Sequence, residues 1–397
     1  MLRKTLFQIH RWVGITAGLV LALVGATGAL LSFEPELVRW IDAAVLTVDA
    51  GHGTPLAAPQ LLSRLHDAHP QRRITSLTLW RDPQATARVV FAVPGDRRGE
   101  VLYVDPASAA LLGASGGDAF FHVVEDLHRR LAAGPVGRSV TGAATLCLVL
   151  MCVTGLVLRW PRRAASWRAW LRLDMRLKGR SFLWNLHAVA GTWVLLLALL
   201  TALTGLYFAY DWYRAGVYAV TGTPQPQRTP PPPKNAIGGP GERVHTPAPD
   251  LGPAWTRLLA AAPQWQQLML RFPERADQPL QVTLLDADAP HDRAFDRLQI
   301  GLAGGELRRH ERYADKPAGA RLVASMLALH TGSFFGWPGR FAMFVGALSM
   351  PLFAVTGWML YLGRRRRAAN DAMGLRKTAP LRPTRHSRGL RQAHREQ

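Results

Sequence analysis

The sequence predicts an integral membrane protein in which an all-α four-helix transmembrane bundle carries two α+β domains outside the membrane. Three observations predict this fold class. Four long runs of the chain are uncharged and apolar, positive charge gathers beside the ends of these runs, and the longer stretches between them alternate as short strands do. Hydrophobic residues make up 48% of the 397 residues, and they concentrate in the four runs.

Each apolar run is long enough to cross a bilayer. The runs cover residues 13–33, 139–158, 182–210 and 341–363. A helix rises about 1.5 Å per residue, so roughly 20 residues cross a hydrocarbon core about 30 Å thick. The first run is longer than the apolar part of a secretory signal, and no Ala-x-Ala cleavage site follows it. We therefore expect it to remain as a membrane anchor.

The formal net charge of +21 lies mainly beside the membrane. Residues 1–12, 159–180 and 364–397 hold 22 Lys and Arg against three carboxylates, and therefore carry +19 of this charge. The positive-inside rule places such segments in the cytoplasm. We expect a multi-pass protein of the bacterial inner membrane, with both termini cytoplasmic and the soluble domains periplasmic. This location makes nucleic-acid binding the weaker interpretation of the charge.

The expected order of segments follows from these boundaries. It is a first spanning helix over residues 1–33, a soluble domain over 34–125, a surface segment and second helix over 126–160, a basic loop over 161–181, a third helix over 182–210, a second soluble domain over 211–325 with a Pro-rich linker over 223–249, a surface segment and fourth helix over 326–363, and a basic tail over 364–397. In the first domain "RITSLTLW", "ARVVFAV" and "GEVLYVD" alternate as strands after the helical "APQLLSRLHDAH". The second repeats this order with "GPAWTRLLAAA", "WQQLMLRF", "PLQVTLLD" and "FDRLQIGL".

The two halves of the chain repeat one pattern, which predicts an internal duplication. "IHRWVGITAG" and "LHAVAGTWVL" place a glycine four residues after His10 and after His187. "DLHRRLAAGPVGR" and "ALHTGSFFGWPGR" place a Gly-Arg pair nine and ten residues after His128 and His330. Each apolar run also contains a Thr-Gly pair, at residues 27–28, 154–155, 204–205 and 356–357. A parallel repeat has a pseudo-twofold axis along the membrane normal, so equivalent residues lie at equal depth.

The four histidines are predicted to bind haem iron, His10 with His187 near the cytoplasmic end and His128 with His330 near the periplasmic end. Ionisable groups in a membrane are costly and suggest function. Two neutral imidazoles that face each other across an axis form an axial ligand set for haem. The sequence therefore predicts two b-type haems with bis-His ligation, held non-covalently because no Cys-x-x-Cys-His motif is present.

Glycines and arginines complete the predicted cofactor sites. They are Gly14, Gly191, Gly28, Gly205, Gly155, Gly357, Arg138 and Arg340. The glycines are expected to give a flat macrocycle room. Helix rise places the second and fourth Thr-Gly pairs near the depth of His10 and His187, and the first and third near that of His128 and His330. The two arginines are expected either to pair with haem propionates near the periplasm or to anchor helices at the interface.

Two other interpretations of the histidines remain open. They could be packing residues, or they could serve zinc or copper transport, because imidazole also binds those metals. Metal transport is disfavoured because the sequence between the histidines has no cluster of carboxylates, thiolates or methionines; only Met343 and Met350 come close.

Together, the His-x-x-x-Gly starts, the Leu-His entries with their Gly-Arg pairs, the Thr-Gly pairs and the "VLYVDP" strand-turn resemble the PepSY-associated transmembrane helix family over residues 1–367. The resemblance implies PepSY-like folds for the periplasmic domains. It also implies an inner-membrane iron-uptake protein, similar to siderophore reductases that bind two b-type haems and release ferrous iron. The second domain departs from the pattern, because "LQIGLAGGEL" lacks the Asp-Pro turn.

These observations lead to the hypothesis of a membrane ferric-siderophore reductase, an oxidoreductase that passes electrons through the bilayer from one haem to the other. A ferric-siderophore or another periplasmic ferric complex would receive the electron. The electron donor, a quinol or a cytoplasmic reductase, must be a separate molecule, because no nucleotide-binding or flavin-binding motif is present. The alternatives are a non-enzymatic, membrane-anchored PepSY binding or regulatory protein and a periplasmic metal-transfer protein.

Overall fold

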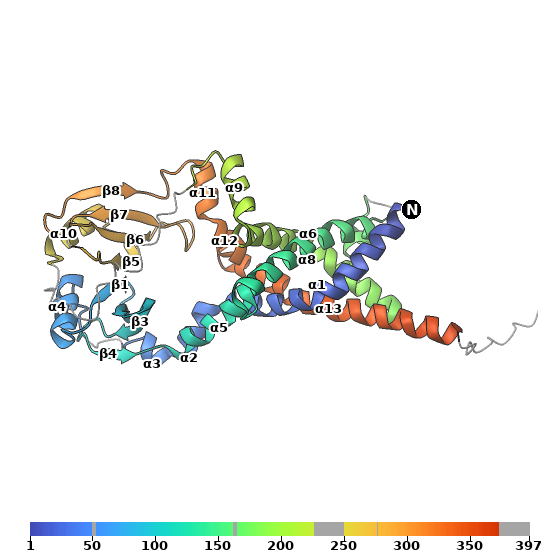
Figure 1. The fold of residues 1–397 in the computed structure, drawn as a ribbon, viewed down its shortest axis with the longest axis horizontal. Coiled ribbons are helices and arrows are strands. Elements are labelled where there is room, and N and C mark those ends of the chain that lie inside the picture. Colours follow the sequence, from blue (N-terminus) through green and yellow to red (C-terminus); the bar gives the residue numbers. More distant parts are fainter. Residues whose placement is uncertain (50–52, 162–164, 226–249, 276, 373–397) are drawn as a thin grey trace, which may run out of the picture.

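The computed structural model describes residues 1–49, 53–161, 165–225, 250–275 and 277–372 (Figure 1). A bundle of long helices forms one end of the molecule, and a β-sheet with its covering helices forms the other. The N-terminus lies at the end of the bundle farthest from the sheet, which we call the far end. Residues 226–249 of the predicted Pro-rich linker and residues 373–397 of the predicted basic tail lie outside the described residues.

In the described residues, four helices are long and apolar enough to cross a membrane. They are α1 (Leu2–Leu31), α6 (Gly134–Arg159), α8 (Gly179–Ala209) and α13 (Gly336–Ala372). The four predicted spanning helices are thereby confirmed. Helix α13 continues past the end of its apolar run, because the arginines and alanines that follow residue 363 favour helix as well. Helix α1 packs against α6 and α13, and α8 packs against the same two helices, so α1 and α8 face each other across the bundle.

The strands form one antiparallel sheet of eight strands within the described residues, in the order β4-β3-β2-β1-β5-β6-β7-β8. The strands are β1 (Ile74–Trp80), β2 (Ala87–Val93), β3 (Asp96–Val104), β4 (Leu111–Gly113), β5 (Trp265–Arg271), β6 (Leu280–Asp286), β7 (Asp296–Ile300) and β8 (Leu307–Glu311). The sequence predicted a separate short sheet in each of two domains. The structure joins the two groups of strands, because β1 pairs with β5 and places Leu77 opposite Leu270. This pairing satisfies the backbone groups of two strands that would otherwise be open edges.

The main core lies between this sheet and helices α4 (Ala58–Ala68) and α10 (Gly252–Ala261), which cover the side away from the bundle (Figure 1). Leu61 and Leu258 from the helices and Leu77 and Leu270 from the strands are at most 1% exposed. Complete burial of such a side chain contributes roughly 1.5–3 kcal/mol. The core therefore contains side chains from both halves of the chain, which makes the sheet region one folding unit.

Shorter helices connect the sheet to the bundle. They are α2 (Glu34–Ile41), α3 (Ala43–Leu46), α5 (Gly116–Arg130), α9 (Asp211–Val220), α11 (Ala318–Ala324), α12 (Met326–Thr331) and the 3-10 helix η2 (Ser333–Phe335), while α7 (Trp167–Leu171) lies in the connection between α6 and α8. Helix α5 follows edge strand β4 and leads into α6. After the other edge strand, β8, the chain passes through α11, α12 and η2 into α13. The two halves thus enter the bundle from opposite edges of the sheet.

Candidate functional site

The structure brings the four predicted histidines together as two facing pairs. The ring centroids of His10 on α1 and His187 on α8 are 6.4 Å apart. The centroids of His128, in the last turn of α5, and His330 on α12 are also 6.4 Å apart. The first pair lies toward the far end of the bundle and the second toward the sheet, in the pairing that the repeat predicted.

The spacing of the rings fits one metal ion between each pair. Two imidazole nitrogens bound at about 2.0 Å to one metal, with each ring centroid about 1.1 Å behind its nitrogen, place the centroids about 6.2 Å apart. The observed 6.4 Å is close to this value in both pairs. The centroid distances in both pairs are thus compatible with one metal ion bound by two imidazoles.

A threonine from each Thr-Gly pair contacts one of these histidines from a neighbouring helix. The distances between threonine Oγ1 and histidine Nδ1 are 2.8 Å for Thr154 and His10, 2.7 Å for Thr356 and His187, 3.2 Å for Thr27 and His128, and 2.9 Å for Thr204 and His330. Each of the four hydroxyls also lies 2.7 or 2.8 Å from the carbonyl oxygen four residues earlier in its own helix. The threonines are therefore held in place by their own helices.

This arrangement sets the tautomer of the imidazoles. A hydroxyl has a single hydrogen, so a threonine that donates it to a carbonyl accepts a hydrogen bond from the Nδ1–H of the histidine. At His128 the carbonyl oxygen of Val24 lies 3.0 Å from the same Nδ1 and can only accept, which also requires the proton on Nδ1. Among the described residues, none is hydrogen-bonded to Nε2 of the four histidines. The Nε2 lone pairs are thus available as metal ligands, with the other nitrogen oriented by a partner.

The glycine of each Thr-Gly pair makes room for the imidazole. A Cβ atom added at Gly28, Gly155, Gly205 or Gly357 would lie 3.1, 3.3, 3.5 or 4.0 Å from Cε1 of the contacting histidine. The sequence placed these glycines at the correct depths and assigned them to the macrocycle. In the structure their neighbour is the imidazole ring, which lies close against the partner helix because no side chain intervenes.

A cavity of about 400 Å³ surrounds the His10 and His187 pair. It lies among all four spanning helices, and its wall is mostly apolar. Gly14 and Gly191 line it, and a Cβ atom at Gly14 would lie 3.1 Å from the methyl carbon of Met151. Both glycines therefore lie where the predicted macrocycle would need room, and that role remains a prediction.

The chemistry of the donors fits a porphyrin better than a lone divalent cation. The described residues contain no group of three or more His, Cys, Asp and Glu side chains that could hold a metal ion. Two imidazoles supply only half of the four ligands that zinc takes in proteins. A haem needs only two ligands from the protein, which the two imidazoles of a pair would supply. The apolar wall around His10 and His187 suits the body of such a macrocycle.

The glycines of the two Gly-Arg pairs allow the segments that carry His128 and His330 to pack closely against the start of the next spanning helix. A Cβ atom at Gly137 would lie 1.6 Å from the carbonyl oxygen of Arg130, and one at Gly339 would lie 2.3 Å from that of Gly332. Only glycine permits such an approach of the histidine-bearing segment to its spanning helix. These close contacts thus help to fix the position of each histidine relative to the bundle.

Both arginines of these pairs bind carbonyl groups at the sheet-side ends of spanning helices. Arg138 donates to the carbonyl oxygens of Phe208 and Ala209 at 3.3 and 3.2 Å. Arg340 donates to the carbonyl oxygen of Ser32 at 2.7 Å and to the Glu36 carboxylate at 2.6 and 2.7 Å, and this hydrogen bond lowers the pKa of Glu36. Both therefore act as helix anchors, and their pairing with propionates remains a prediction.

Two polar clusters that the sequence did not predict hold the helices that carry the sheet-side histidines. At the start of α5 the Asp42 carboxylate accepts hydrogen bonds from the Ser115 hydroxyl at 2.5 Å and from the Gly117 N–H at 2.6 Å, which lower the pKa of Asp42. At the start of α12, Nε2 of His291 lies 3.1 Å from the hydroxyl of Tyr313 and 3.0 Å from that of Ser325. Burial lowers the pKa of His291. No signal in the sequence links these residues, because their partners are remote along the chain.

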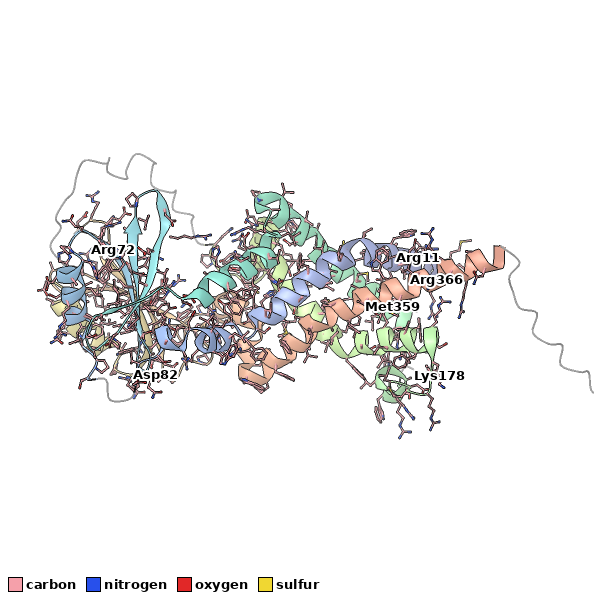
Figure 2. The ribbon with its side chains drawn as sticks, turned by 90° about the horizontal axis from the view of Figure 1, so that it is seen from below. Arg11, Arg72, Asp82, Lys178, Met359 and Arg366 are labelled. Carbon is pink, nitrogen blue, oxygen red and sulfur yellow. The ribbon has the colours of Figure 1, made fainter. Side chains whose placement is uncertain are left out.

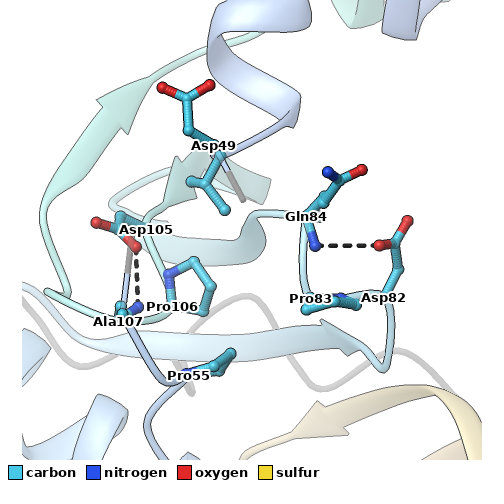
Figure 3. A pocket seen from close by; sticks show the side chains of 10 residues that line it. Asp49, Pro55, Asp82, Pro83, Gln84, Asp105, Pro106 and Ala107 are labelled. Carbon is cyan, nitrogen blue, oxygen red and sulfur yellow. Dashed lines mark hydrogen bonds between the residues drawn. The ribbon is translucent and has the colours of Figure 1, made fainter. Parts of the chain in front are cut away.

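A second cavity, of about 330 Å³, lies in the sheet region and is lined by turns (Figure 3). The carboxylates of Asp82 and Asp105 point to backbone N–H groups two residues further on, at Gln84 and Ala107, over 3.0 and 2.8 Å. These bonds stabilise the turns locally. Asp105 belongs to the Asp-Pro turn that the sequence singled out, so the structure gives that motif a role in the fold.

The fold and the histidine geometry define the class: a membrane protein with four spanning helices, a sheet region at one end and two facing histidine pairs along the bundle. The chain belongs to the family described as the PepSY-associated TM region, whose pattern matches residues 7–364. The match includes all four histidines and confirms the family that the sequence motifs indicated. No curated protein matches the chain.

Proposed function

We propose that this protein is a haem-containing reductase of the bacterial inner membrane, which passes electrons across the bilayer to a periplasmic ferric-siderophore or similar ferric complex and releases ferrous iron for uptake. One observation carries the proposal: two histidine pairs, whose Nε2 atoms form no hydrogen bond with any described residue, lie at different heights of a bundle of helices long enough to span a membrane. Haem, when bound, supplies reversible one-electron chemistry at its iron.

The separation of the two pairs supports a role across the membrane. Along α1, His10 belongs to the far pair, and Thr27 contacts His128 of the sheet-side pair. Seventeen residues of helix separate them, or about 26 Å at the standard rise. This is close to the roughly 30 Å of a hydrocarbon core. The two sites together thus extend over most of the bilayer.

Charge supports the orientation that we propose, with the far end in the cytoplasm and the sheet in the periplasm. Arg11, Lys178 and Arg366 lie at the far end of the bundle (Figure 2). Cytoplasmic ends of spanning helices carry such an excess of Lys and Arg. We include the internal duplication in the proposal, because both halves supply one histidine and one threonine to each site in equivalent positions.

The chain itself provides ligands, orientation and an apolar wall, so an external donor must supply the electron. A quinol or a cytoplasmic reductase fits this role. One electron converts the ferric ion of the substrate to ferrous ion, and hard oxygen ligands hold the less charged ion more weakly. The siderophore is then released without chemical change.

An optical spectrum and a pyridine haemochrome assay on detergent-purified, full-length protein test the proposal. We expect close to two b-type haems per chain, with bands that shift on reduction. His10→Ala and His330→Ala should each lose about one haem, because each change removes a ligand from one pair. The matched control is His122→Ala, an exposed histidine on α5, which should retain both haems.

Two other results would select the alternative functions. A colourless protein, even after expression with a haem precursor, favours a non-enzymatic PepSY binding or regulatory protein. Metal binding without haem bands favours a metal-transfer protein. If haem is present, proteoliposomes with reductant inside and ferric-siderophore outside should produce ferrous iron that an external chelator traps, and His10→Ala should abolish this production.

A further inference from the structure

Four arginines line the cavity around His10 and His187. Each of the four spanning helices in the described residues contributes one of them: Arg11 from α1, Arg159 from α6, Arg180 from α8 and Arg364 from α13. The rest of the cavity wall is mostly apolar. We call these four residues the arginine ring.

Within the part of the chain that the structure describes, the arginine ring lacks counter-charges. None of its guanidiniums forms an ion pair with another described residue. Three of them lie against aromatic rings, Arg11 over Trp12 at 4.9 Å and Arg364 over Phe7 at 5.0 Å, with Arg159 near the ring of Trp184. Such contacts favour the cation but provide no acceptor for its N–H groups.

Two N–H groups of the ring are buried as well as unpaired. Nε of Arg11 and Nε of Arg159 have no hydrogen-bond partner in the described part of the chain. A second nitrogen of Arg159 donates to the carbonyl oxygen of Ala169, which holds the guanidinium beside the cavity. Buried donors without partners are costly, so two of them in residues that line a cavity point to an anionic acceptor from outside the chain.

We infer that the arginine ring binds the carboxylates of the cofactor in the far-side site, and so selects a tetrapyrrole that carries two carboxylates on one edge. The inference rests on the proposed function. Guanidinium groups bind carboxylates through two parallel hydrogen bonds, and four of them suffice for two carboxylates. The apolar wall receives the body of the same molecule. A lipid phosphate offers similar chemistry and is the other source of an anionic group at this depth.

The sheet-side pair has no equivalent ring in the described residues. Arg129 and Arg130, which follow His128 in the chain, form ion pairs with Glu125 and Asp126. Arg138 and Arg340 donate to helix carbonyls or to Glu36. Recognition of carboxylates by unpaired arginines is therefore a property of the far-side site. The two sites should differ in their tolerance of a cofactor without carboxylates.

The test uses full-length protein with only the far-side site intact, obtained separately by His330→Ala and by His128→Ala so that one misfolded variant does not decide the result. After haem removal, each protein is titrated with haem b and with haem b dimethyl ester, which has no free carboxylate. We expect about tenfold tighter binding of haem b, equivalent to ~1.4 kcal/mol. Arg11→Gln and Arg159→Gln should each weaken haem b binding about tenfold and leave the ester unaffected. Arg172→Gln, an exposed residue outside the cavity, is the control.

Three outcomes overturn the inference. Equal affinity for haem b and its ester, in a protein that binds both, refutes the role of the arginine ring and leaves the proposed function standing. If in addition the parent protein retains an anionic phospholipid that the Arg11→Gln variant loses, the ring binds lipid phosphate. If neither form of haem binds, the proposed function fails together with the inference.

Discussion

Alanine substitution at the glycines of the Thr-Gly pairs tests the histidine sites in a graded way. A Cβ atom at Gly28 would lie 3.1 Å from Cε1 of His128, whereas a Cβ atom at Gly357 would lie 4.0 Å from Cε1 of His187. The second distance is an ordinary van der Waals contact. The first requires the imidazole to move by a few tenths of an ångström. Gly28→Ala should therefore damage its site and Gly357→Ala should not.

The imidazole of His128 has little freedom to make this movement. Its Nδ1 lies 3.0 Å from the carbonyl oxygen of Val24 and 3.2 Å from the hydroxyl of Thr27, so a shift away from Gly28 lengthens both contacts. Changes in groups that orient a metal ligand typically cost 10–100-fold in metal affinity. We expect Gly28→Ala to weaken haem binding at the sheet-side site within this range. Gly357→Ala should retain haem and gain up to about 1 kcal/mol of helix stability, because alanine favours helix over glycine.

The assay is the rate of haem transfer from the purified protein to an excess of an apo-haem protein, together with the low-spin ferric signal of each site. Gly155→Ala and Gly205→Ala, at 3.3 and 3.5 Å, should give intermediate rates. Equal haem retention in folded Gly28→Ala and Gly357→Ala proteins would refute the reasoning, because the contact distances would then have no influence on the ligand.

Three further predictions concern the groups around the histidines. Thr356→Val removes the acceptor for His187 Nδ1 at nearly constant volume, and should weaken far-side haem binding 10–100-fold in the same transfer assay, with sheet-side haem unchanged. The lowered pKa of Asp42 means that this carboxylate stabilises the fold above pH of about 4 and that the contribution is lost as pH falls through its pKa in the folded protein; thermal melts of wild type and Asp42→Asn should converge in acid. The lowered pKa of His291 has a different cause, since burial disfavours the charged ring, but it too means that the unfolded chain binds the proton more readily. Stability should decline as pH falls below about 6.5, and His291→Gln should reduce that decline in melts between pH 5 and pH 8.

The spanning helices and the depths of the candidate ligands could be predicted because both depend on regular local geometry. Apolar runs of bilayer length leave few alternatives to helix, and a fixed rise per residue converts sequence offsets into depth. This is why Gly155 could be placed level with His10, and Gly28 level with His128, before any contact was known. The repeat then indicated which histidine faces which.

The contacts between threonine and histidine could not be predicted in the same way. Helix rise gives the height of Thr154 and His10, but it does not give the rotation of each helix about its own axis. Only packing of α1 against α6 determines that these two side chains meet. The partners of Arg340 depend on packing too, because Ser32 and Glu36 lie some three hundred residues earlier in the chain.

The joining of the two groups of strands into one sheet could not be predicted from the sequence pattern either. Alternation identified most strands, but β1 and β5 each resemble an ordinary edge strand of a small sheet. Their pairing is decided by the need to cover open backbone groups and by the contact between leucines of both halves, such as Leu77 and Leu270. Neither requirement changes the spacing of apolar residues along a single strand, so the sequence pattern does not reveal the pairing.

The joined sheet has a consequence for the sheet-side site. Its edge strands β4 and β8 lead into the segments that carry His128 and His330, so the width of one continuous sheet sets how far apart these segments start. Helices α5 and α12 then converge until the two rings are 6.4 Å apart. The far-side pair differs, since His10 and His187 lie on the spanning helices α1 and α8 and not on segments that follow an edge strand. Loss of the β1 and β5 pairing would therefore separate the sheet-side ligands while the far-side ligands stayed in place, which makes the sheet a structural part of one site and not of the other.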